Sequence, residues 1–156
     1  MSIADPRKMQ AQEREAFHRN AELSMQPFRY EKPSTDRVKS IVSVAKGEFV
    51  RIHVQIVKDG GENNLHYHTG SETAWMVLKG RVRFYGVGDE VIGEYGPQEG
   101  ILIPSGARYW FEKIGDEDLE LLQMVGYDRR DGAQAGRINV EAHKEWMTEP
   151  ELQVYE

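Results

Sequence analysis

The tripeptide His66-Tyr67-His68 holds the side chains of this chain that are best placed to do chemistry. It follows a glycine-containing turn at residues 59–61 and precedes a segment of strand-forming residues that runs to residue 80. In a β-strand, residues i and i+2 point to the same face, so the two imidazoles would lie side by side. Neutral imidazole is the commonest metal ligand, and two such rings can bind one divalent ion. The spacing therefore predicts a metal site, and the alternative is a pair of surface histidines.

The composition restricts which function classes are possible. A chain of 156 residues fits one domain that is large enough for a core. Its net charge of −6 makes nucleic acids and acidic membrane surfaces poor partners. The absence of cysteine excludes disulfides, thiolate ligands and cysteine nucleophiles. Because the first ten residues lack a secretory apolar stretch and no run approaches about 18 apolar residues, we expect a cytoplasmic protein.

Short strands separated by glycine-rich turns are predicted through the middle of the chain. They fall at residues 40–45, 49–58, 73–79, 82–85, 91–95, 100–103, 109–113 and 119–125. Many short strands at this spacing predict an all-β sandwich or barrel. Within the second strand, apolar residues alternate with Arg51, His53 and Gln55, so these three polar side chains share one face.

The two ends of the chain are read differently. Asp5 followed by Pro6 is a typical helix start, and it predicts a polar helix over residues 6–23. Pro27 and Pro33 then predict an extended arm. After Gly126 the sequence turns polar, with one short helix predicted over residues 139–148. The expected organisation is a helix and arm at 1–37, a β-barrel at 38–127 and a tail at 128–156.

The strand at residues 73–79 is apolar on both faces. Thr73, Trp75 and Val77 would face the pocket, and the residues between them, at 74, 76 and 78, are apolar too. A strand of this kind is covered on both faces. The cover must come from the N-terminal arm or from a second subunit, so we expect a homodimer.

Two stretches resemble the two sequence motifs of the cupin family. Residues 60–80, GGENNLHYHTGSETAWMVLKG, resemble the first motif, in which a glycine, an HxH pair, an acidic ligand and a closing glycine follow one another. Residues 96–113, GPQEGILIPSGARYWFEK, resemble the second, whose core is PxGxxH. Pro104, Gly106 and Tyr109 occupy those three positions. The resemblance covers roughly residues 40–127 and implies a cupin jelly-roll β-barrel, here with an N-terminal helix and arm and a short C-terminal helical tail.

The sequence departs from the cupin pattern at the metal ligands. A metal-binding cupin supplies two histidines and a glutamate from the first motif and one histidine from the second. His66 and His68 match, whereas Thr73 stands at the acidic position and Tyr109 at the last histidine position. Glu72 is adjacent but falls on the opposite face of a regular strand. A divalent ion bound by neutral imidazoles would need an anionic partner: the Tyr109 phenolate, Glu72 or an anionic substrate.

The resemblance also implies which other residues line the pocket. In germins, which are cupins, the positions of His53 and Asn63 carry pocket-facing polar residues. His53 and Tyr109 are the candidates for acid and base catalysis, the alternatives being an exposed strand histidine and a buried tyrosine bonded to backbone. The predicted substrate-binding residues are Asn63, Trp75, Gln55, Arg51 and Thr73.

The leading hypothesis is a small-molecule cupin enzyme. A divalent first-row transition metal (Fe, Mn, Ni, Co or Zn) would be bound by His66 and His68, and a small oxygenated substrate would undergo oxygenase, isomerase or lyase chemistry. The fold does not select among these reactions. Two alternatives stay open: a non-catalytic cupin that binds a small molecule, and a metal-free acid/base enzyme that uses His53, His66 and Tyr109.

Overall fold

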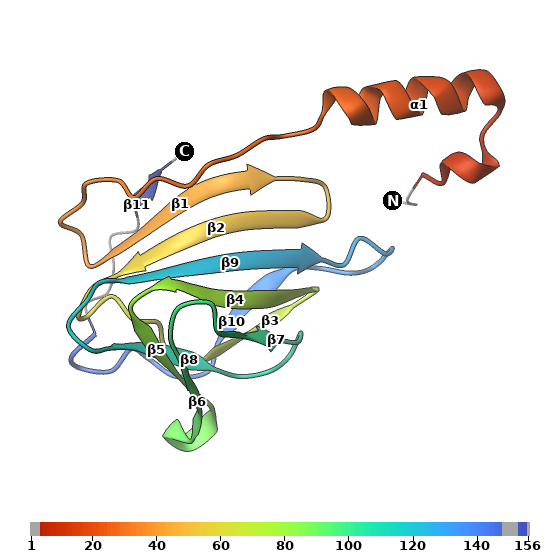
Figure 1. Ribbon diagram of the computed structural model, residues 1–156. Helices are drawn as coiled ribbons and strands as arrows, with labels where there is room; N and C mark the ends of the chain where they lie inside the picture. Colours follow the sequence, from red (N-terminus) through yellow and green to blue (C-terminus); the bar gives the residue numbers. More distant parts are fainter. Residues whose placement is uncertain (1–3, 148–152, 156) are drawn as a thin grey trace.

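The computed structural model describes residues 4–147 and 153–155, and most of its regular structure is β-strand (Figure 1). Its helical elements are the 3₁₀ turns η1 (Pro6–Lys8) and η2 (Val87–Asp89) and the helix α1 (Ala11–Leu23). The strands in chain order are β1 (Lys39–Lys46), β2 (Val50–Val57), β3 (His66–Thr69), β4 (Ser71–Lys79), β5 (Arg81–Tyr85), β6 (Val91–Tyr95), β7 (Gly100–Ile103), β8 (Trp110–Ile114), β9 (Leu119–Tyr127), β10 (Gly136–Asn139) and β11 (Gln153–Tyr155).

The strands form two layers. One layer is a six-stranded sheet in the order β11-β1-β2-β9-β4-β7, in which every pair except β1 with β11 is antiparallel. The other layer contains the pair β10-β3 and the trio β6-β5-β8. His66 and Tyr109 connect these two parts, because each donates its backbone N–H to the other's carbonyl, at 3.1 and 2.9 Å. The predicted all-β jelly-roll architecture is confirmed.

The strand register places the predicted functional side chains on the inner face of the large sheet. His53 lies opposite Gln123, and Gln55 lies opposite Leu121, in the β2–β9 pair. Thr73 lies opposite Val125 in the β4–β9 pair. The alternation predicted for β2 is therefore confirmed.

An aromatic core fills one end of the barrel. Trp75, Phe84, Tyr109 and Phe111 are all buried, and their rings contact one another with centroids 5.5–6.5 Å apart. Offset and edge-on aromatic pairs of this kind stabilise a core beyond the area they bury. The other end of the barrel is left to polar side chains.

The N-terminal arm lies along the outer face of the large sheet. The Gln26 side chain bonds to the backbone of Lys46 in both directions, at 2.8 and 3.3 Å. Further along, Tyr30 donates its hydroxyl to Glu120 at 2.6 Å. The arm thus crosses from β1 to β9, where the outward-facing Ile56 is fully buried beside it. These contacts lie on β1 and β9, so the cover expected for the strand at residues 73–79 stays a prediction.

Helix α1 projects away from the barrel (Figure 1), and none of its residues is buried. The helix predicted over residues 6–23 is present but interrupted. Asp5 caps the 3₁₀ turn η1 by accepting the Arg7 backbone N–H at 3.0 Å, Met9 and Gln10 leave the helical conformation, and α1 begins at Ala11. Among the described residues, no helix has the length and apolar character needed to cross a membrane.

The helix predicted over residues 139–148 is wrong for the described part, residues 139–147. Residues 136–139 instead form β10, which pairs antiparallel with β3, and the Val140 N–H continues the contact to the Leu65 carbonyl at 2.9 Å. The physical reason is that β3 has a strand edge whose backbone groups need partners. The β-branched Ile138 and Val140 also suit an extended chain better than a helix. Residue 148 lies outside the described residues.

Candidate functional site

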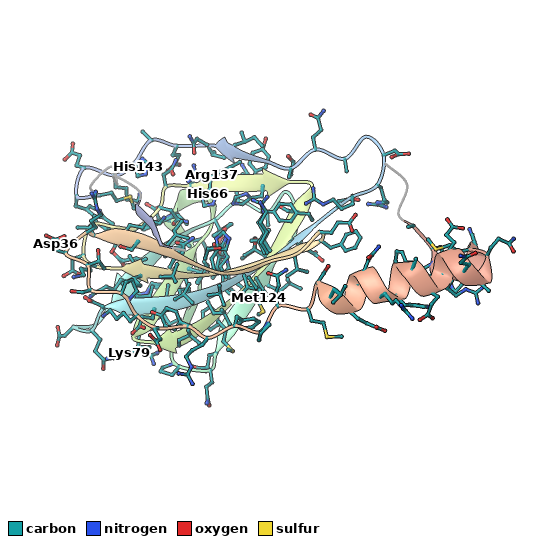
Figure 2. All side chains as sticks on the ribbon, turned by 90° about the horizontal axis from the view of Figure 1, so that it is seen from above. Asp36, His66, Lys79, Met124, Arg137 and His143 are labelled. Atoms are coloured by element: carbon teal, nitrogen blue, oxygen red, sulfur yellow. The ribbon has the colours of Figure 1, made fainter. Side chains whose placement is uncertain are left out.

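A cavity of about 800 Å³ lies at the polar end of the barrel, between the inner face of β1, β2, β4 and β9 and the pair β3–β10. Figure 2 labels three of its residues: His66 and Arg137, from the paired strands β3 and β10, and His143, from the segment that follows β10. Most of the predicted site residues line this cavity: Arg51, His53, Gln55, Asn63, His66, His68 and Thr73.

Tyr109 and Trp75 lie behind the cavity wall and not on it. Tyr109 is 1% exposed and belongs to the aromatic core, with its ring centroid 4.6 Å from that of His66. Trp75 is 3% exposed and lies next to Tyr109, at 6.5 Å between ring centroids. Both were predicted to take part in the site, but their side chains belong to the aromatic core and do not line the cavity.

His66 is held in one orientation by the backbone. Its Nδ1 lies 2.6 Å from the Asn64 carbonyl oxygen, and because a carbonyl only accepts, Nδ1 carries the hydrogen. In the neutral ring, Nε2 is then the acceptor. Burial lowers the pKa of His66 to about 3, and the positive charge of Arg137 acts in the same direction. Burial and then Arg137 also lower the pKa of His68, so both rings are neutral near pH 7.

The residues around this pair fit a resident metal poorly. The rings of His66 and His68 are close, with centroids 5.0 Å apart. Between residues 4 and 147, however, no three histidine, aspartate or glutamate side chains converge to hold an ion. Glu72 is exposed on the outer face, and burial raises the pKa of Tyr109 to about 12, which keeps its phenol protonated. A divalent ion bound by two neutral imidazoles needs a negatively charged partner, and neither Glu72 nor Tyr109 supplies that charge.

The cavity instead has an excess of positive charge. Four basic side chains line it, Lys39, Arg51, Arg129 and Arg137, whereas Glu62 is the one acidic lining residue in the part of the chain that the structure describes. This contrasts with the net charge of −6 for the whole chain. A concave site lined by one sign of charge attracts ligands of the opposite sign.

Several buried polar atoms around the cavity have no hydrogen-bond partner. Within the described residues these atoms are Arg51 Nε, Gln55 Oε1, Glu62 Oε2, Trp75 Nε1 and Tyr109 Oη. The first three belong to residues that line the cavity, and the other two lie directly behind it. A buried polar group without a partner costs about 1–3 kcal/mol, so such groups are rare in folded proteins. The two atoms behind the wall are out of reach of a ligand, whereas those of Arg51, Gln55 and Glu62 are on the lining and are available to a polar ligand in the cavity.

His53 is a histidine of the cavity wall that carries no charge near pH 7. Burial lowers its pKa, and the neighbouring positive charge of Arg51 lowers it further. The ring is therefore neutral near pH 7 and partly accessible on the cavity wall. A neutral imidazole in reach of a bound ligand is the usual general base in enzymes.

Sequence reasoning missed Lys39, Glu62, Gln123, Arg129 and Arg137. For Lys39 a signal was present, because it continues the inward alternation of the strand predicted at residues 40–45. Glu62 lies in a loop, where no periodicity indicates direction. Arg137 reaches the cavity only because β10 pairs with β3, and that pairing has no local sequence signal.

Comparison with known proteins gives the same fold. The family model described as a cupin domain matches residues 53–125, which run from β2 to β9. Among solved structures, an uncharacterized conserved protein with a double-stranded β-helix domain from Klebsiella pneumoniae superimposes with a TM-score of 0.58. The two chains are 16% identical over 72% of this chain and 87% of that one. Residues 53–125 therefore match the cupin domain, and the described part of the chain has the cupin fold.

Two further structures support the assignment of the fold. An RmlC-like cupin family protein from Methanocaldococcus jannaschii gives a TM-score of 0.55 at 15% identity, over 67% of this cupin and 93% of that chain. An RmlC-like cupin from Desulfovibrio desulfuricans gives 0.53 at 21% identity, over 65% and 96%. Comparison with curated proteins gives no match. At these identities the similarity establishes the fold of this cupin alone.

The buried His66 makes the stability of this cupin depend on pH. In the unfolded chain its imidazole takes up a proton below about pH 6.5, whereas in the folded chain it does so only near pH 3. Between these values the unfolded state binds more protons, so this contribution to stability is lost as the pH falls. We expect the difference in unfolding free energy between wild type and His66→Gln to narrow by about 1 kcal/mol or more between pH 7 and pH 5.

Urea unfolding at the two pH values measures this effect. The exchange His18→Gln, on the exposed helix α1, is the matched control and should change the unfolding free energy little at either pH. A constant difference between wild type and His66→Gln would show that His66 is not held neutral by the fold.

Proposed function

We propose that this cupin binds a small organic anion of the carboxylate class in the cavity. The observation that carries the proposal is the excess of cationic side chains there: four basic residues face one carboxylate within the described lining. Pairs between a guanidinium and a carboxylate are among the strongest hydrogen-bonded contacts in proteins, because both charges and two parallel hydrogen bonds contribute.

Arg137 has the geometry of a fixed anion-binding group. Its guanidinium donates to Asn64 Oδ1 at 2.6 Å and also to Asn139 Oδ1. Both acceptors are neutral amides, so the positive charge is oriented without being neutralised. A guanidinium remains protonated at any physiological pH. Arg137 therefore presents an oriented positive charge to the cavity.

Arg51 supplies a second cation from the opposite wall of the cavity. Its guanidinium lies 5.2 Å from the centre of the Tyr127 ring, which supports it by a cation–π contact. Its buried Nε has no hydrogen-bond partner, and Gln55 Oε1 on the same strand face has none either. A carboxylate would accept from Arg51, and a hydroxyl on the same ligand would donate to Gln55. A small carboxylic acid with a second oxygen-containing group, such as a hydroxyl, would satisfy both side chains.

His53 gives such a site the means for acid/base chemistry. As a neutral imidazole beside Arg51, it can remove a proton from a ligand whose carboxylate is bound by that arginine. Isomerisation, elimination and decarboxylation of carboxylic acids each include a proton transfer, so each could use His53. Tyr109 would act on this chemistry through its contact with the His66 ring, because it does not line the cavity.

A metal-assisted form of the same function is the second candidate, and one contact favours it. The Asn64 carbonyl fixes the proton of His66 on Nδ1, which leaves Nε2 free as a ligand atom. His66 and His68 would then hold a first-row divalent metal (Fe, Mn, Ni, Co or Zn), provided that the bound anion supplies the missing ligand and negative charge. The metal would in that case accompany the anion and would not reside in the protein without it.

The outer face of the large sheet supports the proposal that two copies of this cupin associate. The arm covers β1, β2 and part of β9, but apolar side chains on β4, β7 and the start of β2 stay exposed. Leu102 is 60% exposed, Val50 45% and Leu78 37%, and Met76 and Met124 between them are only partly buried. A continuous apolar face of this kind is typical of an interface.

Binding of small carboxylates tests the main proposal. We expect oxalate, malonate, succinate or pyruvate to bind with an affinity that falls as salt concentration rises, because the contacts are between charges. Arg137→Gln and Arg51→Gln should each weaken binding tenfold or more, which corresponds to about 1.4 kcal/mol. Isothermal titration calorimetry measures both effects. Arg19→Gln on the exposed helix α1 is the matched control, and it should leave binding unchanged. Absence of binding across the panel, or equal affinity in all three variants, would contradict the proposal.

Metal content distinguishes the second candidate from the first. Because the protein offers two imidazoles and positive surroundings, we expect little Fe, Mn, Ni, Co or Zn to remain after dialysis without an anion. With malonate present, a metal-assisted site should retain close to one ion per chain, and His66→Ala/His68→Ala should lose it. Elemental analysis measures this. Equal retention by wild type and the double variant would remove the metal-assisted candidate and leave the anion site as it stands.

Size-exclusion chromatography with light scattering tests the association of two copies. We expect the wild type to elute as a dimer and Leu102→Lys to shift it towards the monomer, because a charge would be buried in the apolar face. Ile92→Lys is the matched control: Ile92 is 46% exposed but lies on β6, in the other layer. A wild type that stays monomeric at all concentrations would contradict this part of the proposal.

A further inference from the structure

Lys39 is one of the four basic residues of the cavity, and the proposed function uses its charge but not the nucleophilicity of its amine. It is the first residue of β1, it lies opposite Val57 in β2, and its side chain lines the cavity. Its Nζ lies 5.9 Å from the centre of the Phe111 ring, at the boundary of the aromatic core. In the part of the chain that the structure describes, no other lysine lines this cavity.

The surroundings of Lys39 favour a neutral amine more than those of a surface lysine do. Burial lowers the pKa of its ammonium to about 8, and the positive charge of Arg137 contributes to the lowering. The carboxylate of Glu62 opposes it only in part. A lysine that is desolvated and placed next to another cation is the usual form of a nucleophilic amine in enzymes, because the free base is present near neutral pH.

The loop that carries Glu62 is fixed against the start of β1. A Cβ atom on Gly61 would come within 2.0 Å of the Val38 carbonyl oxygen, so the two backbones touch and only glycine fits. Glu62 follows Gly61, and Lys39 follows Val38, so this contact brings their side chains to the same part of the cavity wall. Glu62 is 2% exposed, and its Oε2 has no hydrogen-bond partner.

These observations give the cavity a nucleophile, a carboxyl group and a carboxylate-binding pair of arginines. We infer that Lys39 forms an imine with the carbonyl carbon of an oxo acid whose carboxylate is bound by Arg51 and Arg137. The carboxylate half of this inference rests on the proposed function, and the amine half rests on the placement of Lys39 and Glu62.

The reaction balances without any other reagent. The lone pair of the Lys39 Nζ attacks the carbonyl carbon, the C–N bond forms, and the carbonyl oxygen takes up a proton to give a carbinolamine. Glu62, whose pKa burial raises, can then protonate the hydroxyl group, which leaves as water while the nitrogen lone pair forms the C=N bond. The sum is one amine and one ketone converted into one protonated imine and one water, with one proton taken up. Hydrolysis returns the lysine by the reverse route.

Reductive trapping tests the inference. The protein is incubated with pyruvate or with acetoacetate, as a 2-oxo and a 3-oxo acid, and the imine is reduced with borohydride. Intact mass should show one reduced adduct per chain, and peptide mapping of the wild type should place it on Lys39. Lys39→Arg keeps the charge but cannot form an imine, so the adduct should be lost. Lys46→Arg, the same exchange at the exposed end of β1, should retain it.

The outcomes separate this inference from the proposed function. A missing adduct, or label spread evenly over surface lysines, overturns it, and binding of malonate in the same preparation would then show that the anion site stands without it. An adduct on Lys39 that is not competed by malonate, in a protein that binds no malonate, supports the amine and overturns the anion site. Because peptide mapping locates the adduct in the wild type, the assignment to Lys39 holds even if Lys39→Arg folds poorly.

Discussion

The cost of removing charged and polar groups from water is the constraint on which this structure depends. One end of the barrel meets it by packing mainly apolar side chains together, among them the tilted, edge-on and stacked rings of Trp75, Phe84, Tyr109 and Phe111. The other end keeps its cations and imidazoles around an open space. Desolvation there keeps His66 neutral and lowers the pKa of Lys39. The protonation states of the cavity residues therefore follow from their burial.

The backbone orients the side chains that this burial makes reactive. The Asn64 carbonyl selects the tautomer of His66, and the Asn64 side chain accepts a hydrogen bond from Arg137. One loop residue therefore orients both the imidazole and the guanidinium. Asn63 next to it accepts the Phe111 N–H at 2.8 Å and ties the same loop to the aromatic core. The Asn63 side chain, which was predicted to bind substrate, therefore also has a structural function through its hydrogen bond to Phe111. Second-layer contacts of this kind are what give a binding site its precision.

Prediction from sequence succeeded where a short-range pattern decides the structure. Alternation placed Arg51, His53 and Gln55 on one face of β2, and the spacing of His66 and His68 placed both on the cavity wall. It failed where a distant partner decides. Residues 136–139 form a strand because they pair with the edge of β3. The sequence of the tail alone does not indicate that this edge is available. Trp75 shares the inner face with Thr73, but the depth at which each lies depends on the aromatic rings from other strands.

The position of β10 has a consequence for how the protein comes into being. The strands β2 to β9 are complete by residue 127, whereas Arg137 and the rest of the cavity's cover are contributed by the segment that follows. A ribosome releases these residues after the barrel strands, so a nascent barrel would first expose its basic interior to water. The docking of β10 on β3 then adds Arg137 to the cavity wall. The full set of cationic side chains in the cavity is therefore completed late in synthesis, because Arg129 and Arg137 follow residues 53–125, which match the cupin domain.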